Sequence, residues 1–383
     1  MATGAALMTW FAAAGAALWL AVLIAPWQPW RIGETLEPEP DPAPGTGPWP
    51  LDDITVLIPA RDEAAVIGGT LAALDGQGAG LRVLLIDDQS GDGTAAIARA
   101  AGLEKLHVIS GMPPPAGWSG KLWALEQGRA RVETPLILLL DADIAIAPGM
   151  IVALARKRER DGLAMVSLMA ALRMDGVWER LLMPAFIHFF KLLYPFRLAN
   201  RPGRRFAAAA GGCILIDGQA LDRIGGFAAI HGALIDDCAL AAAIKRAGGR
   251  IWIGLSHGVR SRRAYPTLAS VWDLVARTAY AQLRRAPLLL ALCTLLMMTA
   301  FGAPVAALAI VDGLAAALGL LGLATMALAY LPVLRYYRRS PFWALAMPVI
   351  GTLFLLMTWT SAIRHWRGKG VRWKGRHYAI GGA

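Results

Sequence analysis

The sequence predicts an α/β fold in which a mostly parallel mixed sheet lies between helices, with transmembrane helices before and after it in the chain. Between residues 53 and 254, short apolar runs alternate with segments that have the spacing of amphipathic helices. This alternation is typical of a parallel sheet with helices on both faces. Longer apolar stretches precede and follow this region, and they are long enough to cross a bilayer.

The apolar runs between residues 53 and 254 are too short to cross a bilayer and are interpreted as buried strands. They predict strands at residues 54–60, 82–88, 106–110, 135–143, 163–171, 212–217 and 250–255. The segments between them predict helices at residues 63–75, 93–101, 119–132, 148–160, 218–224 and 236–247. No GxGxxG sequence follows the first strand, so a dinucleotide-binding fold is not supported.

Residues 1–30 predict an N-terminal transmembrane anchor, because residues 5–25 are uncharged and about long enough to span a bilayer. A cleaved signal peptide is the alternative. The anchor is favoured because basic residues are missing from the start and no clear small-residue cleavage site precedes Pro26. Residues 31–52 are rich in Pro, Gly and Glu, which predicts a linker rather than part of the fold.

Residues 53–285 are predicted to form one α/β domain. This domain includes residues 177–198, which are apolar but interrupted by prolines and charged residues. They predict an amphipathic helix that lies in the membrane interface, with an ordinary buried helix as the alternative. Residues 286–365 predict C-terminal transmembrane segments, and residues 366–383 predict a basic tail.

The apolar runs at residues 287–311, 313–334 and 341–363 could each span the membrane. Three full spans would place the basic tail on the opposite side from the α/β domain. The positive-inside rule favours a cytoplasmic tail, so residues 287–301 are alternatively re-entrant, and the number of complete spans stays open. We expect a multi-pass protein of a bacterial-type inner membrane, with the α/β domain on the cytoplasmic side.

The net charge of +11, from 38 basic and 27 acidic residues, does not indicate a nucleic-acid partner. Much of the basic excess flanks apolar segments, at residues 201–205, 335–339 and 364–376, where it favours anionic lipid. No zinc-finger or helix-turn-helix pattern is present. The three cysteines form no CxxC pair, so buried thiols are expected rather than a zinc site or disulfides. The oligomeric state is not indicated.

Two groups of aspartates follow apolar runs: Asp87 with Asp88, and Asp141 with Asp143. The carboxyl ends of parallel strands are where open α/β sheets bind ligands. Residues two apart on a strand point to the same side, so Asp141 and Asp143 would repel each other unless a cation lay between them. A Mg²⁺ or Mn²⁺ ion shared with a diphosphate removes that repulsion. A solvated pair in a loop is the alternative.

The first strand ends, and a helix begins, at a run of five residues: Pro59, Ala60, Arg61, Asp62 and Glu63. A turn in front of a helix amino terminus can hold a nucleobase and a ribose, and a capped strand–helix junction is the alternative. After the second strand, Asp87 and Asp88 are predicted to be functional, with Asp88 accepting hydrogen bonds from base or ribose. Residues 90–94 are interpreted as a turn and a helix cap.

Other charged residues at helix starts and strand ends are candidates for binding or catalysis. Lys121 follows a glycine-containing loop, which suits a phosphate contact, although the spacing is not that of a P-loop and a solvated lysine is the alternative. Asp236 and Asp237 open a helix, where they stabilise its dipole or supply a general base. His257 is a candidate third metal ligand or a structural histidine. Arg277 is a candidate partner of a diphosphate or of lipid headgroups.

These motifs, in this order, resemble the family 2 glycosyltransferases, which are inverting enzymes of the GT-A fold. The resemblance covers residues 54–282 and rests on P-A-R-[DN]-E, D-D-x-S-x-D-x-[TS], D-x-D and an adjacent acidic pair. It implies nucleotide contacts for Asp62, Asp88 and Lys121, metal and diphosphate contacts for Asp141 and Asp143, and the role of catalytic base for Asp237. Of the QxxRW motif of that family, only Arg277 is present, within Leu274–Thr278.

A closer resemblance is to the hopanoid-biosynthesis-associated membrane glycosyltransferases, relatives of the ceramide glucosyltransferases. It rests on GWSGKLWAL, LIDDCALA and VARTAYAQL and on Trp373-Lys374-Gly375-Arg376. It implies a nucleotide sugar donor, a hopanoid- or sphingolipid-like acceptor, and the bilayer as a partner. We expect a UDP-sugar as donor, with Mg²⁺ or Mn²⁺ as cofactor.

Two other functions stay open. A processive polysaccharide synthase would add many sugars, and the missing Gln and Trp of QxxRW weigh against it. A non-catalytic lipid-binding membrane scaffold with a degenerate transferase domain is the second, and the intact acidic motifs weigh against that.

Overall fold

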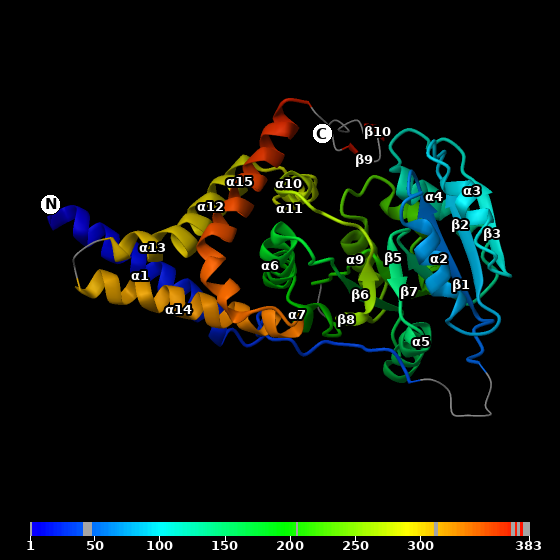
Figure 1. Ribbon diagram of the computed structural model, residues 1–383, viewed down its shortest axis with the longest axis horizontal. Helices are drawn as coiled ribbons and strands as arrows, with labels where there is room; N and C mark the ends of the chain where they lie inside the picture. The colour runs from blue at the N-terminus through cyan, green and yellow to red at the C-terminus, as the bar shows by residue number, and fades with distance from the viewer. Residues whose placement is uncertain are drawn as a thin grey trace. The chain divides into compact units, whose positions relative to one another are not determined.

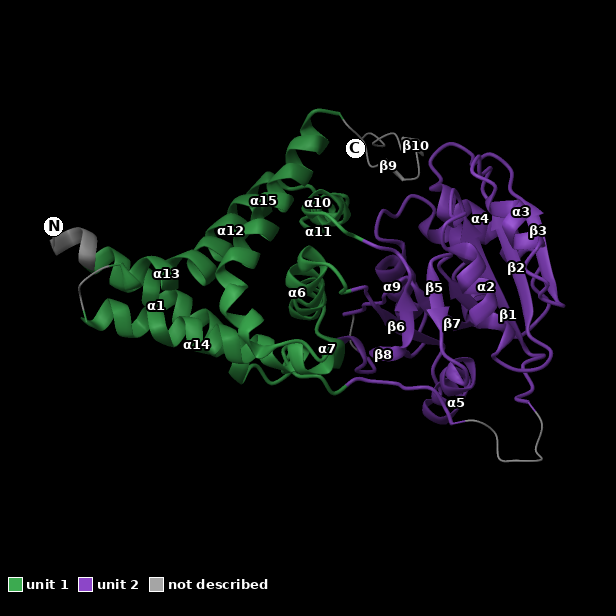
Figure 2. Ribbon diagram, in the orientation of Figure 1, with its two compact units in different colours: residues 1–33, 174–197, 265–372 green, residues 34–173, 198–264, 373–383 purple. Residues whose placement is uncertain are grey.

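The computed structural model describes residues 2–40, 48–203, 206–309, 313–368, 372–373 and 376–377. Figure 1 labels the elements along the chain. The chain divides into two compact units, which Figure 2 distinguishes by colour. The helical unit comprises residues 1–33, 174–197 and 265–372, and the sheet unit comprises residues 34–173, 198–264 and 373–383.

The sheet unit is built on an 8-stranded sheet with the order β3-β2-β1-β4-β7-β6-β8-β5. Its strands are β1 (Ile54–Ala60), β2 (Arg82–Asp87), β3 (Leu106–Ser110), β4 (Leu136–Leu140), β5 (Ile144–Ile146), β6 (Met165–Ala171), β7 (Cys213–Asp217) and β8 (Ile251–Ser261). β3, β2, β1 and β4 are parallel, β7 is antiparallel to β4 and β6, β8 is parallel to β6, and β5 is antiparallel to β8. The predicted mostly parallel mixed sheet is confirmed, because four of the seven strand pairings are parallel.

Neighbouring residues of the central strands contribute to different cores, one on each face of the sheet. Ile58 of β1 packs with α2 (Ile67–Asp75), α3 (Thr94–Arg99) and α5 (Met150–Asp161). Leu57 of the same strand packs on the other face, where the helical elements are α4 (Gly120–Arg129), α8 (Gly218–Arg223), η1 (Gly226–Ile230) and α9 (Asp236–Arg246). Burial on both faces explains why these strands are continuous apolar runs.

Two strand boundaries differ from the prediction, and both affect the acidic residues. β4 ends at Leu140, so Asp141 and Asp143 lie in the turn between β4 and β5, where Ile144 N donates to Asp141 O at 3.0 Å. The prediction that these aspartates alternate along a strand is therefore wrong. β8 continues beyond the predicted end at residue 255 to Ser261, because its last residues pair with the short edge strand β5.

The start of the predicted linker is part of the sheet unit. Leu36 N donates to Leu255 O at 3.0 Å, and Leu255 N donates to Glu34 O at 2.9 Å. Glu39 N donates to Gly149 O at 3.2 Å, and the Glu39 carboxylate pairs with Arg156 at 2.9 Å. Residues 34–36 thus pair with β8, because extended backbone can pair with an open strand whatever its composition. Residues 41–47 of the predicted linker lie outside the described residues.

The helical unit contains helices from both ends of the chain and from one central segment, residues 174–197. They are α1 (Ala2–Ile24), α6 (Val177–Leu193), α10 (Leu268–Ala276), α11 (Ala279–Gln282), α12 (Pro287–Met297), η2 (Met298–Gly302), α13 (Ala303–Leu308), α14 (Gly313–Tyr336), η3 (Pro341–Ala346) and α15 (Met347–Trp366). The short helix α7 (Phe196–Ala199) and the strands β9 (Arg372–Trp373) and β10 (Arg376–His377) complete the described elements.

Within the part of the chain that the structure describes, four stretches are long and apolar enough to cross a membrane: Ala6–Ile24, Pro287–Leu308, Gly313–Tyr336 and Pro341–Trp366. The segment considered as re-entrant, residues 287–301, is helical and belongs to the second of these stretches. The prediction of apolar helices on both sides of the α/β domain is therefore confirmed.

Helix α6, predicted as an interfacial helix of the α/β domain, groups with the apolar helices instead. Phe189 packs edge-on against Phe301 and Phe354, at ring-centroid distances of 5.9 and 4.7 Å. Glu179 fixes the start of the helix, because its carboxylate accepts from Gly176 N at 3.0 Å and from Tyr265 N at 2.6 Å.

Candidate active site

The loops that follow β1 and β2 are held together by side-chain hydrogen bonds. Asp62 N donates to Ser90 Oγ at 3.0 Å, and Asp62 Oδ1 accepts from Gly91 N at 2.9 Å. Glu63 N donates to Thr94 Oγ1 at 2.8 Å. Residues 90–94 therefore act as the structural turn that their sequence predicts. Asp62 has φ 50, in the left-handed region, which short polar side chains tolerate better than most.

Beneath these loops, Asp87 and Asp88 are buried, with 7% and 1% of their surface exposed. Asp87 Oδ2 accepts from Ser90 N at 3.3 Å. The Arg61 guanidinium donates to the carbonyl oxygen of Asp88 and lies 3.9 Å from its carboxylate. The structure thus brings the predicted Arg61, Asp62, Asp87 and Asp88 together.

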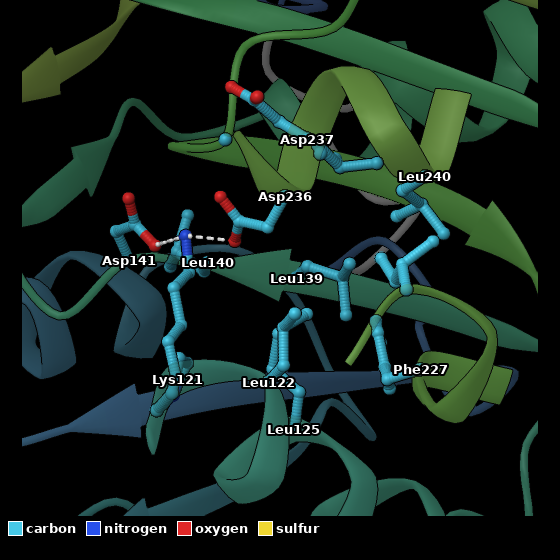
Figure 3. A pocket seen from close by; sticks show the side chains of 14 residues that line it. Lys121, Leu122, Leu125, Leu139, Leu140, Asp141, Phe227, Asp236, Asp237 and Leu240 are labelled. Carbon is cyan, nitrogen blue, oxygen red and sulfur yellow. Dashed lines mark ion pairs between the residues drawn. The ribbon is translucent and has the colours of Figure 1, made fainter. Parts of the chain in front are cut away.

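Lys121 connects the turn after β4 to the start of α9. Ser119 caps α4, with its Oγ accepting from Leu122 N at 3.2 Å, and this places Lys121 in the first turn. Lys121 Nζ lies 2.9 Å from Asp141 Oδ1 and 3.2 Å from Asp236 Oδ2, and Figure 3 shows these carboxylates on either side of the ammonium. Burial opposes the positive charge, but Asp141 and Asp236 raise the pKa of Lys121 above its ordinary value.

Asp237 follows Asp236 in the first turn of α9, and its Oδ1 accepts from Cys238 N at 2.7 Å. Burial raises the pKa of Asp237 to about 7, and the Asp236 carboxylate adds to this, whereas Lys121 lowers it. Burial also raises the pKa of Asp141, in opposition to Lys121. We call Lys121, Asp141, Asp236 and Asp237 the lysine cluster.

The lysine cluster lies at an open pocket, where the empty space, open solvent included, is about 320 Å³. The remaining lining is mostly apolar: Pro59, Leu122, Leu125, Leu139, Leu140, Gly211, Ile214, Phe227, Ile230 and Leu240. Gly211 keeps the space between two members of the cluster open, because a Cβ at this position would lie 3.3 Å from Lys121 Nζ and 3.4 Å from Asp237 Oδ2.

The second aspartate of the turn, Asp143, has a different cation as its partner. Arg263 Nε donates to Asp143 Oδ2 at 3.0 Å, and Ser261 Oγ donates to the same oxygen at 3.1 Å. Arg263 Nη2 donates to both carboxylate oxygens of Glu63, at 2.6 and 2.7 Å. We call Glu63, Asp143 and Arg263 the arginine cluster.

The sequence did not point to Arg263 because the last strand was predicted to end at residue 255. The available signal was the basic pair Arg262-Arg263. Once β8 is extended to Ser261, this pair directly follows a strand that is parallel to β6.

A divalent cation fits the carboxylates of Asp141 and Asp143 in part. No group of three His, Cys, Asp or Glu side chains that could hold a metal occurs among the described residues. Asp141 Oδ2 and Asp143 Oδ1 have no hydrogen-bond partner within the described part of the chain, so each could supply one oxygen. Mg²⁺ sites commonly use one or two carboxylates together with substrate phosphates.

His257 does not join these aspartates, contrary to its prediction as a metal ligand. It lies on β8, where its Nδ1 is 3.0 Å from Glu37 Oε1. No group of three possible metal ligands among the described residues includes it. Arg277 lies in the helical unit, exposed at the end of α10.

Comparisons with known proteins agree with this architecture. Undecaprenyl-phosphate 4-deoxy-4-formamido-L-arabinose transferase of Shewanella sediminis is 30% identical over 159 residues, which are 40% of this chain and 44% of that protein. 4,4'-Diaponeurosporenoate glycosyltransferase of Staphylococcus aureus is 34% identical over 91 residues, 24% of each chain. The chain thus matches less than half the length of these relatives.

Among solved structures, the mannosyltransferase PcManGT from Pyrobaculum calidifontis, in complex with GDP-Man and Mn²⁺, has a TM-score of 0.57 and 19% identity, and the match covers 94% of this chain and 99% of that chain. This likeness confirms the predicted GT-A fold class. A family model described as glycosyl transferase family 21 matches residues 105–382, which is most of the sequence, and the chain therefore belongs to that family.

Proposed function

We propose that this protein is a membrane-bound inverting glycosyltransferase that moves a sugar from a nucleotide sugar to a lipid acceptor. Membership of glycosyl transferase family 21 supports the reaction class. The observation that carries the proposal is the pair of contacts of Lys121 with Asp141 and Asp236 at one pocket. Asp141 belongs to the turn after β4, which would bind the diphosphate. Asp236 belongs to the start of α9, where Asp237 would act as the base.

Asp237 is the proposed base. Its pKa of about 7 lets it take up a proton near neutral pH, which is the condition for an efficient general base. In the proposed reaction it removes the proton from an acceptor hydroxyl as the oxygen attacks the anomeric carbon. The bond from that carbon to the diphosphate breaks, and the nucleoside diphosphate leaves with the electron pair.

Asp141 and Asp143 are the proposed binding site for Mg²⁺ or Mn²⁺ and the donor diphosphate. When bound, such a cation offsets negative charge on the leaving diphosphate. The presence of GDP-Man and Mn²⁺ in the PcManGT complex supports a nucleotide sugar and a divalent cation in general. We retain a UDP-sugar as the expected donor. Pro59 to Glu63, Asp88 and Lys121 are the proposed nucleotide contacts.

A lipid acceptor is supported by the relatives, whose names specify undecaprenyl-phosphate and 4,4'-diaponeurosporenoate. The four apolar stretches support a location in a membrane, where such an acceptor would lie. Within this class we propose a hopanoid- or sphingolipid-like acceptor, on the resemblance of the sequence motifs, and an inner-membrane location with the sheet unit on the cytoplasmic side.

The test uses the purified full chain with a lipid extract from its host, a panel of radiolabelled nucleotide sugars, and Mg²⁺ or Mn²⁺. Asp143→Ala is assayed alongside. Label in a small organic-soluble product that is lost in the variant is the expected result, and it identifies the donor. Label that enters only insoluble polymer would favour a processive synthase. No transfer and no nucleotide binding would favour the non-catalytic scaffold.

A further inference from the structure

The arginine cluster contains a residue to which the proposed function assigns no role. Arg263 follows β8, whereas Glu63 follows β1 and Asp143 lies in the turn before β5. The Glu63 and Asp143 side chains are only 10% and 14% exposed, and Arg263 is 32% exposed. A guanidinium that bonds both oxygens of Glu63 and one oxygen of Asp143 is fixed in orientation, because its donors form a rigid planar fork.

Asp143 is also one of the two carboxylates that fit a divalent cation. A cation at Asp143 would place two further positive charges beside the Arg263 guanidinium, and like charges at this range repel. The bare cation therefore competes with Arg263 for the negative charge of Asp143. A donor diphosphate would bring negative charge to both the cation and the guanidinium, and so would relieve that repulsion.

We propose that Arg263 is a positioning residue that makes cation binding at Asp143 depend on the presence of the donor diphosphate. The inference rests on the proposed function, since it assumes a diphosphate donor at this turn. Linkage requires that the cation then improves diphosphate binding by the same factor by which the diphosphate improves cation binding. Arg263 sets the size of that factor, because it weakens the binding of the cation alone.

The experiment measures binding rather than transfer, on the full chain in detergent. Free Mn²⁺ is followed by its paramagnetic resonance signal, with and without UDP or GDP, and UDP and GDP binding is followed by calorimetry with and without Mn²⁺. In Arg263→Met, Mn²⁺ alone should bind about fivefold more tightly or better, and the coupling between Mn²⁺ and the diphosphate should fall by at least the same factor. A merely structural role would weaken both ligands together.

Arg262→Met is the matched control, because it removes the same charge from the neighbouring residue. The Arg262 guanidinium lies against Gly69 of α2, where a Cβ would be 2.3 Å from its Cζ, and it has no contact with an acidic side chain among the described residues. Its Mn²⁺ and diphosphate affinities should equal those of the wild type. Arg263→Lys retains the charge without the planar fork, so Mn²⁺ alone should bind it nearly as weakly as the wild type, while UDP or GDP binds less tightly.

Arg263→Met that binds Mn²⁺ alone no more tightly than the wild type would overturn the role of Arg263, provided that its melting temperature is unchanged. If that variant does not fold, Arg263→Lys decides the question. The role of Arg263 would be overturned if this variant bound Mn²⁺ more tightly than the wild type, as expected for loss of the charge. It would also be overturned if the diphosphate affinity of this variant were unchanged. If the wild type binds both Mn²⁺ and the diphosphate, such a result would overturn only the role of Arg263 and not the proposed function. A wild type that binds neither would overturn the proposed function as well.

Discussion

The lysine cluster and the arginine cluster each place one cation among carboxylates, and they divide Asp141 and Asp143 between them. In the lysine cluster, one ammonium faces three carboxylates, and the pKa of Asp237 is raised to about 7. In the arginine cluster, one guanidinium faces two carboxylates and makes three short hydrogen bonds to them.

The difference shows how two residues of one turn come to have different chemistry. Lysine is a compact charge on a flexible stem, so its site tolerates more carboxylates than one cation can neutralise. One of them, Asp237, therefore titrates near neutral pH. Arginine offers donors at fixed angles, so its site holds the two carboxylates in one geometry. We therefore expect Asp237 of the lysine cluster to control proton transfer. The arginine cluster should act on ligand binding, together with Asp141 and Lys121.

Asp237→Asn should have the largest effect, because it removes the proposed base and leaves the arginine cluster intact. The transfer rate should fall by roughly 10²- to 10⁴-fold, while diphosphate binding with Mn²⁺ is retained. Radiolabel transfer to lipid measures the first and calorimetry the second. Asp222→Asn makes the same change at an exposed carboxylate and should be neutral. Wild-type transfer by folded Asp237→Asn would refute the base assignment.

Lys121→Met should change the pH dependence of transfer. Lys121 lowers the pKa of Asp237, so its removal raises that pKa further above the ordinary range of an aspartate. A base acts in its deprotonated form, so the rising limb of the rate against pH should move to higher pH. The rate at pH 7 should then fall about tenfold for each pH unit by which the limb moves. Lys105→Met, at an exposed lysine near Asp52, is the control. If the rate rose over the same pH range in Lys121→Met as in the wild type, Lys121 would not act on Asp237.

Gly211→Ala should disturb the lysine cluster by a smaller amount. Its Cβ would press on Lys121 Nζ and Asp237 Oδ2, both at the ends of side chains that can give way. We expect kcat/KM to fall by roughly fivefold. This corresponds to about 1 kcal/mol, which is the lower end of the usual cost of overpacking. Gly76→Ala, where nothing lies within 4 Å of the new Cβ, is the control. Equal losses in both variants would argue against a specific effect at the pocket.

Ser261→Ala should have the smallest effect and should be confined to the arginine cluster. It removes one donor to Asp143 Oδ2 and the hydroxyl that accepts from Arg263 N at 3.3 Å, but it leaves the bond from Arg263 Nε to Asp143. The free energy of unfolding should fall by about 1 kcal/mol, and the pH at which transfer rises should stay constant. Ser110→Ala, exposed at the end of β3, is the reference. A pH limb that moves in Ser261→Ala would show that the two clusters are not separate.

Much of the fold was predictable because burial leaves a direct mark on the sequence. Strands buried on both faces must be continuous apolar runs, and this located β1, β2, β6 and β7 closely. The acidic motifs were found for a related reason. Charged residues that directly follow a buried run lie at the edge of the sheet, where Asp87, Asp88 and Asp141 are found.

The features that were missed depend on pairing rather than on composition. β5 has only three residues and pairs with the end of β8, so its presence altered both the Asp141 turn and the boundary that concealed Arg263. The segment at residues 34–39 has a linker-like composition, but its backbone pairs with Leu255. His257 had a suitable side chain in a suitable region, but the register of β8 places it beside Glu37.

The sequence by itself determined the α/β class, the apolar helices on both sides of it, and the chemical types available at the sheet edge. These follow from side-chain hydrophobicity and spacing, which are local properties. Only the tertiary structure decided that Lys121 joins Asp141 to Asp236. It also decided that Arg263 joins Asp143 to Glu63, which lies 200 residues before Arg263 in the chain. Such pairs are set by strand register and by the packing of distant segments, so no local pattern in the chain records them.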